Sequence, residues 1–133
     1  MNRFISIFFY VSLLFFSGSS LATAAFDGSK PLVCAIVEVF DCDVQFECDR
    51  VNANSVNLPE IFRMDIQKKE MSGADRITKI QHVAHEEGRV ILHGSSGTGR
   101  GWSVSLSEST GKFTGAVAAD DFGFLIFGSC IAD

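Results

Sequence analysis

Basic residues and helical periodicity are both scarce in this sequence, and their scarcity excludes several classes of protein. The 133 residues include 11 Lys and Arg against 16 Asp and Glu, which gives a net charge of −5 at pH 7. Nucleic-acid affinity is built from cations that neutralise phosphates, so this balance disfavours a nucleic-acid-binding protein. A hydrophobic content of 47% is typical of one globular domain and excludes a disordered tail or a collagen-like repeat.

Catalytic and cofactor-binding motifs are also missing. The Gly-rich segment 94–101 lacks the Lys-Ser/Thr pair of a phosphate loop and runs into a strand pattern, so we expect a flexible hairpin loop there. The same segment lacks the Gly-x-Ser-x-Gly pattern of an esterase. No two cysteines have the Cys-x-x-Cys spacing of a redox-active pair. The sequence therefore predicts a protein with no enzymatic activity and no cofactor.

The longest hydrophobic run lies at the N-terminus and is short for a membrane span. Arg3 precedes an apolar stretch at 4–16, and small residues follow at 22–25. This pattern predicts a signal peptide over residues 1–25, cleaved after Ala24 or Ala25, and a single β domain over residues 26–133. An uncleaved N-terminal anchor is the alternative. Because no later segment approaches membrane-spanning length, we expect the mature chain to have no membrane span and to be soluble outside the cytoplasm.

The four cysteines predict disulfides rather than a zinc site, because an exported chain of this size meets an oxidising compartment. Cys34, Cys42 and Cys48 lie close together in the sequence, whereas Cys130 stands alone near the C-terminus. Three pairings are possible. The spacing favours Cys34–Cys130, which would tie the two ends of the fold together, and Cys42–Cys48, which would close a local hairpin.

Strand patterns bounded by Gly, Asp or Ser recur along the mature chain at intervals of about 8 to 12 residues. They predict an all-β fold, an antiparallel meander of about eight strands that forms an up-and-down β-barrel or a flattened barrel. A two-sheet β-sandwich is the alternative. The last strand, 122–128, is apolar on both faces, which favours a neighbouring segment over its second face. The bulky inward side chains favour a filled interior, and they are Phe62, Met64, Trp102, Leu106, Phe113 and Phe124.

Three stretches carry a resemblance to known proteins. They are GWSVSLSESTGKFTGAVAADDFGFLIFGSC at 101–130, LVC at 32–34 with the Cys42 and Cys48 pair, and LPEIFRMD at 58–65. With its Trp strand, Thr-Gly turn and terminal Phe-Gly-x-Cys, the chain resembles a group of small exported bacterial proteins of unknown function. The resemblance implies a compact, disulfide-clasped β fold in a bacterial envelope and assigns no functional residue. In size, export, barrel-like pattern and cystine clasp, the chain is also loosely similar to the periplasmic inhibitors of lysozyme.

Acidic side chains alternate around the predicted Cys42–Cys48 hairpin. They are Asp41, Asp43, Glu47 and Asp49. One interpretation is a solvated edge that discourages aggregation. The other is a docking surface for a basic partner, with charge steering the encounter.

The sequence has three histidines, His82, His85 and His93, and their imidazole groups are candidate metal ligands. If Glu87-Gly88 forms a two-residue turn, His82 lies directly across from His93 and His85 points to the opposite face. Two imidazoles are fewer than the three or four ligands of a stable zinc site, so we expect no bound metal.

Two functions remain open for the mature chain, which carries about −6 with ten Lys and Arg against 16 Asp and Glu. The first is a non-enzymatic, inhibitor-like envelope module, in the periplasm or outside the cell, that binds a basic envelope protein through its acidic surface. The alternative is a lipocalin-like carrier of a small apolar ligand. The large inward side chains favour the first, because they leave little volume for a guest. No sequence feature fixes an oligomeric state.

Overall fold

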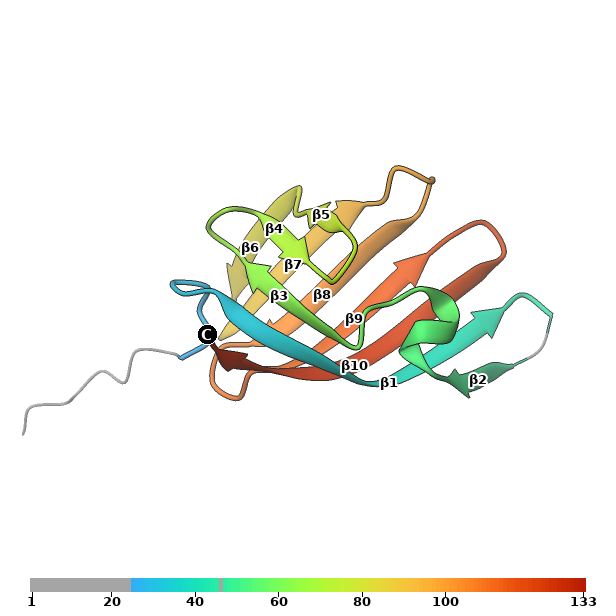
Figure 1. The fold of residues 1–133 in the computed structure, drawn as a ribbon, viewed down its shortest axis with the longest axis horizontal. Helices are drawn as coiled ribbons and strands as arrows, with labels where there is room; N and C mark the ends of the chain where they lie inside the picture. Colours follow the sequence, from blue (N-terminus) through green and yellow to red (C-terminus); the bar gives the residue numbers. More distant parts are fainter. Residues whose placement is uncertain (1–24, 46) are drawn as a thin grey trace, which may run out of the picture.

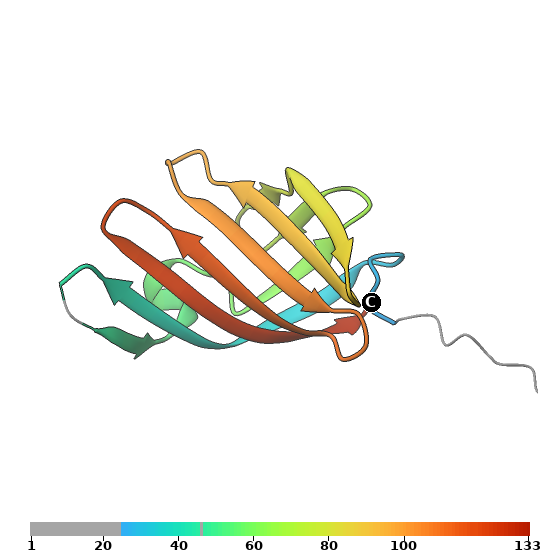
Figure 2. The ribbon, with the colours of Figure 1, turned by 180° about the vertical axis from the view of Figure 1, so that it is seen from behind.

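The computed structural model describes residues 25–45 and 47–133, which form one antiparallel sheet curled into an open half-barrel (Figures 1 and 2). A 3₁₀ turn, η1 (Ala53–Val56), interrupts the strands in the Asn-rich loop. Residues 1–24, which hold most of the predicted signal peptide, lie outside the described residues. The ten strands are β1 (Leu32–Asp43), β2 (Cys48–Val51), β3 (Ile61–Asp65), β4 (Glu70–Ser72), β5 (Ile77–Lys79), β6 (His82–Glu86), β7 (Arg89–Ser95), β8 (Gly101–Ser107), β9 (Lys112–Ala118) and β10 (Phe122–Ala132).

The strand order confirms the predicted all-β antiparallel meander. Neighbours in the sheet run β5-β4-β3-β1-β10-β9-β8-β7-β6, and every pairing is antiparallel. The long strand β1 pairs with β10 on one side, while on its other side β3 covers its first part and β2 its last part. Its pairing shifts by one residue at Val37, and this bulge bends the strand where its partner changes.

Both predicted disulfides are confirmed, and one of them clasps the first strand to the last. Cys34 lies directly opposite Cys130 across β1 and β10, and the bond joins residues 96 positions apart. Closing a loop of this length stabilises the folded state by about 4.7 kcal/mol in the chain-entropy model. Cys42 pairs with Cys48 across β1 and β2. Two disulfides indicate an oxidising compartment, which favours a place outside the cytoplasm.

The sheet has ten strands rather than the eight expected, because the stretch at 77–85, whose pattern predicts a single strand, forms two strands and because β4 was not predicted. The stretch at 77–85 changes partner at Ile80. The Ile80 N–H donates to the Lys69 carbonyl at 2.8 Å, and the Gln81 N–H donates to the His93 carbonyl at 2.9 Å. The chain thus passes directly from β5, at one edge of the sheet, to β6, at the other edge, and the two edges meet at this corner.

The tight turns have the backbone conformations that their residues allow. Glu87 and Gly88 both have positive φ, 48° and 75°, as the predicted two-residue hairpin turn requires. Gly111 has φ 70° in the turn between β8 and β9, where an added Cβ would lie 2.8 Å from the Phe26 ring. The Phe26 ring therefore packs on this turn and covers one end of the half-barrel.

The core fills the end of the half-barrel that lies near Phe26. Four large side chains there have no exposed surface, namely Leu32, Met64, Leu92 and Leu106. The disulfide-bonded Cys34 and Cys130 are buried beside them in the same cluster. Burying a leucine or methionine side chain contributes about 1.5–3 kcal/mol each, so this end of the fold is well stabilised.

The outer face of β10 is apolar, as predicted, yet it remains open to solvent among the described residues. Leu125, Phe127 and Ile131 are exposed on it. Phe127 makes an edge-to-face contact with Phe40 of β1, with ring centroids 6.2 Å apart. No helix within residues 25–45 and 47–133 is long and apolar enough to cross a membrane.

Candidate functional site

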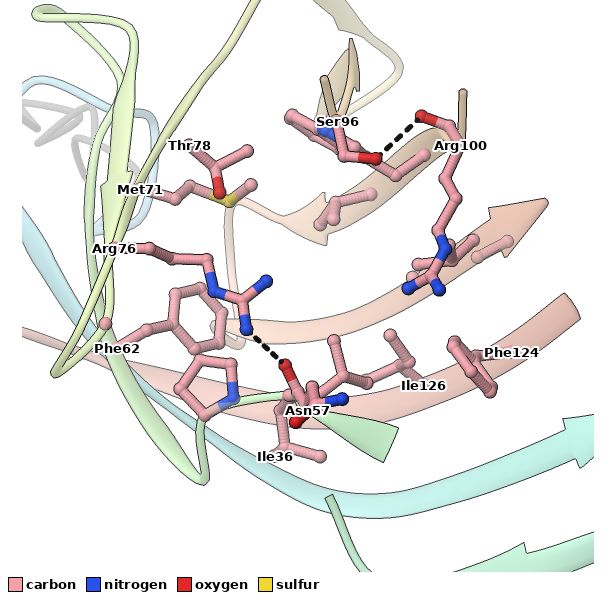
Figure 3. A pocket seen from close by; sticks show the side chains of 18 of the residues that line it. Ile36, Asn57, Phe62, Met71, Arg76, Thr78, Ser96, Arg100, Phe124 and Ile126 are labelled. Atoms are coloured by element: carbon pink, nitrogen blue, oxygen red, sulfur yellow. Dashed lines mark hydrogen bonds between the residues drawn. The ribbon is translucent and has the colours of Figure 1, made fainter. Parts of the chain in front are cut away.

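A cavity of about 530 Å³ occupies the other end of the half-barrel and opens to solvent (Figure 3). The expectation of a filled interior is therefore wrong for this end. Met64 and Leu106, from the predicted inward set, are fully buried in the core. The other four predicted inward residues line the cavity instead. The apolar wall includes Ile36, Leu58, Phe62, Phe113, Phe124 and Ile126.

The space is left open because the inward face of β9 carries a glycine between two larger residues. Phe113, Gly115 and Val117 all line the cavity, because alternate residues of a strand point to the same face of the sheet. Gly115 is buried, and a Cβ on it would lie 3.5 Å from Val104 and 3.6 Å from Ile126, at ordinary contact distance. A larger side chain at this position would therefore project into the cavity.

Trp102 forms another part of the wall and is half-buried rather than fully buried. Its indole packs on Gly94 of the neighbouring strand, where an added Cβ would lie only 2.2 Å from the ring. The indole Nε1 is buried and has no hydrogen-bond partner among the described residues. A buried donor without a partner costs about 1–3 kcal/mol, so apolar packing must hold this ring in place.

Residues of three irregular segments line the cavity: the chain after η1, the β4–β5 turn and the β7–β8 loop. The first two are tied together. Asn57, with φ 58°, accepts a hydrogen bond on its carbonyl from Arg76 Nη2 at 3.0 Å. Gly73 packs closely on Pro59, since a Cβ on Gly73 would lie 3.1 Å from the ring. The predicted hairpin loop at 94–101 forms the third segment.

The charged side chains that line the cavity are all cationic. They are Arg76, Lys79 and Arg100, and no Asp or Glu is among the lining residues. Lys79 is paired with Glu70. Arg76 and Arg100 have no carboxylate partner within residues 25–45 and 47–133. Figure 3 shows their guanidinium groups extending from opposite sides into the space between them.

Hydroxyl groups accompany the cations around the opening. Thr78 lies on the Arg76 side and Ser96 on the Arg100 side (Figure 3). Ser96 Oγ lies 2.9 Å from Thr98 Oγ1. The Arg100 guanidinium carbon lies 5.0 Å from the centroid of the Phe122 ring, which supports this side chain through a cation–π contact. The cavity thus combines an apolar interior with a polar, cationic rim.

The predicted acidic residues lie on the β1–β2 hairpin and do not line the cavity, although Asp41 is directly opposite the lining residue Phe124. Asp41 is directly opposite Asp49, next to the Cys42–Cys48 disulfide. Asp43 and Glu47 are exposed at the tip of the hairpin. The adjoining β9–β10 turn adds Asp120 and Asp121, and the Asp121 carbonyl accepts the Val44 N–H at 3.2 Å.

The histidines have the predicted register. His82 pairs with His93 across β6 and β7, with ring centroids 6.0 Å apart. His85 instead contacts Glu108, with its Nδ1 2.9 Å from the Glu108 Oε1. Within the part of the chain that the structure describes, no three His, Cys, Asp or Glu side chains come together as a metal site.

The residues that make this cavity distinctive, Gly115, Arg76 and Arg100, were not among the predicted site residues. Arg100 offered a weak signal, since it is the only charged residue in the Gly-rich segment. Arg76 offered no such signal, because the charge of the neighbouring Asp75 balances its charge in the sequence.

Comparisons with known proteins return no relatives: the chain matches no protein-family model, no curated protein and no solved structure. The description that the chain supports is a disulfide-bonded antiparallel β half-barrel. Any functional conclusion must therefore come from the geometry of the cavity and of the surface.

Proposed function

We propose that this protein is a non-enzymatic carrier that holds a small apolar molecule in the half-barrel cavity. The observation that carries the proposal is the apolar-walled space of about 530 Å³ next to Gly115. Ligand pockets in proteins occupy about 300–1,000 Å³ and have mostly apolar walls with a few polar groups, and this cavity has that size and composition. The sequence-based preference for a protein-binding module assumed a filled interior, and the cavity removes that reason.

The proposed setting is the bacterial periplasm or the extracellular space. The leader pattern at 1–25, the two disulfides and the resemblance to small exported bacterial proteins support it. An apolar molecule is poorly soluble in such an aqueous compartment, and a protein that encloses it keeps it dispersed.

The carrier proposal is tested by titrating the disulfide-intact mature protein with N-phenyl-1-naphthylamine, a neutral fluorescent apolar probe. We expect a saturable rise in emission with one site per chain, reversed by dodecanol as a non-fluorescent competitor. Lysozyme of similar size serves as the control for surface adsorption. A signal that never saturates, or that dodecanol does not reverse, would contradict a ligand-holding cavity.

A second candidate function uses the acidic hairpin as a docking surface for a basic envelope protein, in the manner of an inhibitor. Facing Asp41 and Asp49, with Asp120 and Asp121 on the next turn, support it, because they concentrate negative charge at one end of the molecule. Retention of a cationic, lysozyme-like hydrolase should then be strong at low salt, weak at high salt and lost in the Asp43→Lys/Glu47→Lys variant. Equal retention by the variant would exclude this surface.

A further inference from the structure

Resting on the proposed carrier function, we infer that the ligand is an amphiphilic anion, with an apolar tail in the cavity and an acidic head group between Arg76 and Arg100. The two guanidinium groups extend into the cavity from opposite sides (Figure 3). A carboxylate and a phosphate monoester share the chemistry that guanidinium groups recognise, namely oxygen acceptors in one anionic group.

The charge distribution is the main argument. The chain as a whole has more acidic than basic residues, 16 against 11, yet the cavity lining contains three cations and no carboxylate. A cationic head group would be repelled there. A neutral ligand would leave the guanidinium groups of Arg76 and Arg100 without an anionic partner among the described residues, whereas an anionic head group gives them one.

The arginines are also held in positions suited to this task. Arg76 donates from Nη2 to the Asn57 carbonyl at 3.0 Å, which uses one of the five donors of its guanidinium group. Arg100 is half-buried and rests against the Phe122 ring. Each side chain therefore keeps donors for a ligand while its orientation is already restricted, which lowers the entropic cost of binding.

The net negative charge of the protein does not prevent the approach of an anion. At physiological ionic strength the screening length is about 8 Å, so distant carboxylates act weakly at the opening. None of the carboxylates of the β1–β2 hairpin lines the cavity, although Asp43 lies directly opposite Phe122, the residue on whose ring Arg100 rests. The charged side chains that a ligand meets in the cavity lining are therefore cations only.

The test compares ligands that share a tail and differ in the head group. Dissociation constants of dodecanoate, dodecyl phosphate and dodecanol are measured at pH 8 by displacement of N-phenyl-1-naphthylamine, below the micellar range. We expect the wild-type protein to bind at least one of the two anions about tenfold or more tightly than dodecanol, which is the size of a charge-assisted hydrogen bond. The tighter of the two anions identifies the head group.

Variants assign this preference to particular side chains. Arg76→Gln and Arg100→Gln should each weaken the binding of the anion about tenfold more than they weaken the binding of dodecanol. Arg89→Gln is the matched control, since Arg89 is exposed on β7, contacts Ser105 at 3.4 Å and does not line the cavity. It removes the same charge and should leave both affinities unchanged.

The outcomes separate this inference from the function on which it rests. Equal binding of dodecanol and both anions by the wild-type protein would overturn the anionic head group and keep the carrier. Absence of binding by all three ligands would overturn both. An equal loss of preference in the Arg89→Gln variant would also overturn the inference, because general charge rather than the cavity arginines would then set it. The wild-type comparison needs no variant and stands if a substitution prevents folding.

Discussion

Replacing Gly115 with valine should stabilise the protein and reduce the volume of the cavity at the same time. A Cβ at this position would lie 3.5 Å from the Ser103 carbonyl oxygen and from Val104 Cγ2, so it meets no steric conflict. The rest of the side chain would occupy space that is open in the wild-type protein. Valine is also favoured in strands, where its branched side chain packs on the pleated surface.

The expected gain in stability follows from two contributions. A fully buried valine side chain stabilises a fold by about 1.5–3 kcal/mol, and roughly half of this applies where the cavity is open on one side. Removing a glycine from the unfolded chain adds about 0.4–1 kcal/mol. The unfolding free energy should therefore rise by about 1–2.5 kcal/mol, which raises Tm by at least about 4 °C in a domain of this size.

The assay pairs thermal unfolding with titration by N-phenyl-1-naphthylamine. Gly115→Val should unfold at a higher temperature than the wild-type protein and bind the probe at least tenfold more weakly. Gly101→Val is the matched control, because Gly101 is exposed at the start of β8, with no atom within 4 Å of an added Cβ. It should bind the probe like the wild-type protein. Lower stability together with unchanged probe binding in Gly115→Val would refute the reasoning, since no fillable cavity would then exist beside Gly115.

Three further predictions concern the scaffold. The Cys34→Ala/Cys130→Ala variant should lose about 4–5 kcal/mol of unfolding free energy in urea titrations, because this disulfide closes a long loop. The Cys42→Ala/Cys48→Ala variant should lose only about 2 kcal/mol, because its loop is short. Equal losses in the two variants would contradict the dependence on loop length. Leu92→Ala should lose about 2–5 kcal/mol in the same titration, because Leu92 is fully buried, and a loss below 1 would place it outside the core. Gly94→Ala should cost about 1–3 kcal/mol and shift the emission of Trp102 to longer wavelength, because its Cβ would meet the indole at 2.2 Å. An unshifted spectrum would show that the indole does not rest on Gly94.

Much of the fold could be predicted because its determinants are local in the sequence. Trp102, Val104 and Leu106 alternate with serines, so their strand and its inward face follow from the period of two. The Cys34–Cys130 pairing followed from spacing, and it correctly placed the first strand beside the last. The division at Ile80 could not be predicted, since it depends on which carbonyls, Lys69 and His93, lie next to the chain at the corner.

The cavity could not be predicted, because an empty volume depends on the separation of segments that are distant in the sequence. Inward side chains such as Phe62 and Phe113 are bulky, and an edge-to-face contact with centroids 5.8 Å apart lets them pack on each other rather than fill the centre. Arg76 and Arg100 belong to a turn and a loop, where periodicity carries no information about direction. Only the curl of the sheet brings both to the same opening.

The most direct test of the carrier account is mass spectrometry of the small molecules that copurify with the protein from its native source. The wild-type protein should retain close to one equivalent of an apolar or amphiphilic molecule, and Gly115→Val, purified in parallel, should retain much less. The account would be contradicted if neither protein retained a small molecule while both captured the same basic protein at low salt, because the acidic hairpin rather than the cavity would then be the working site.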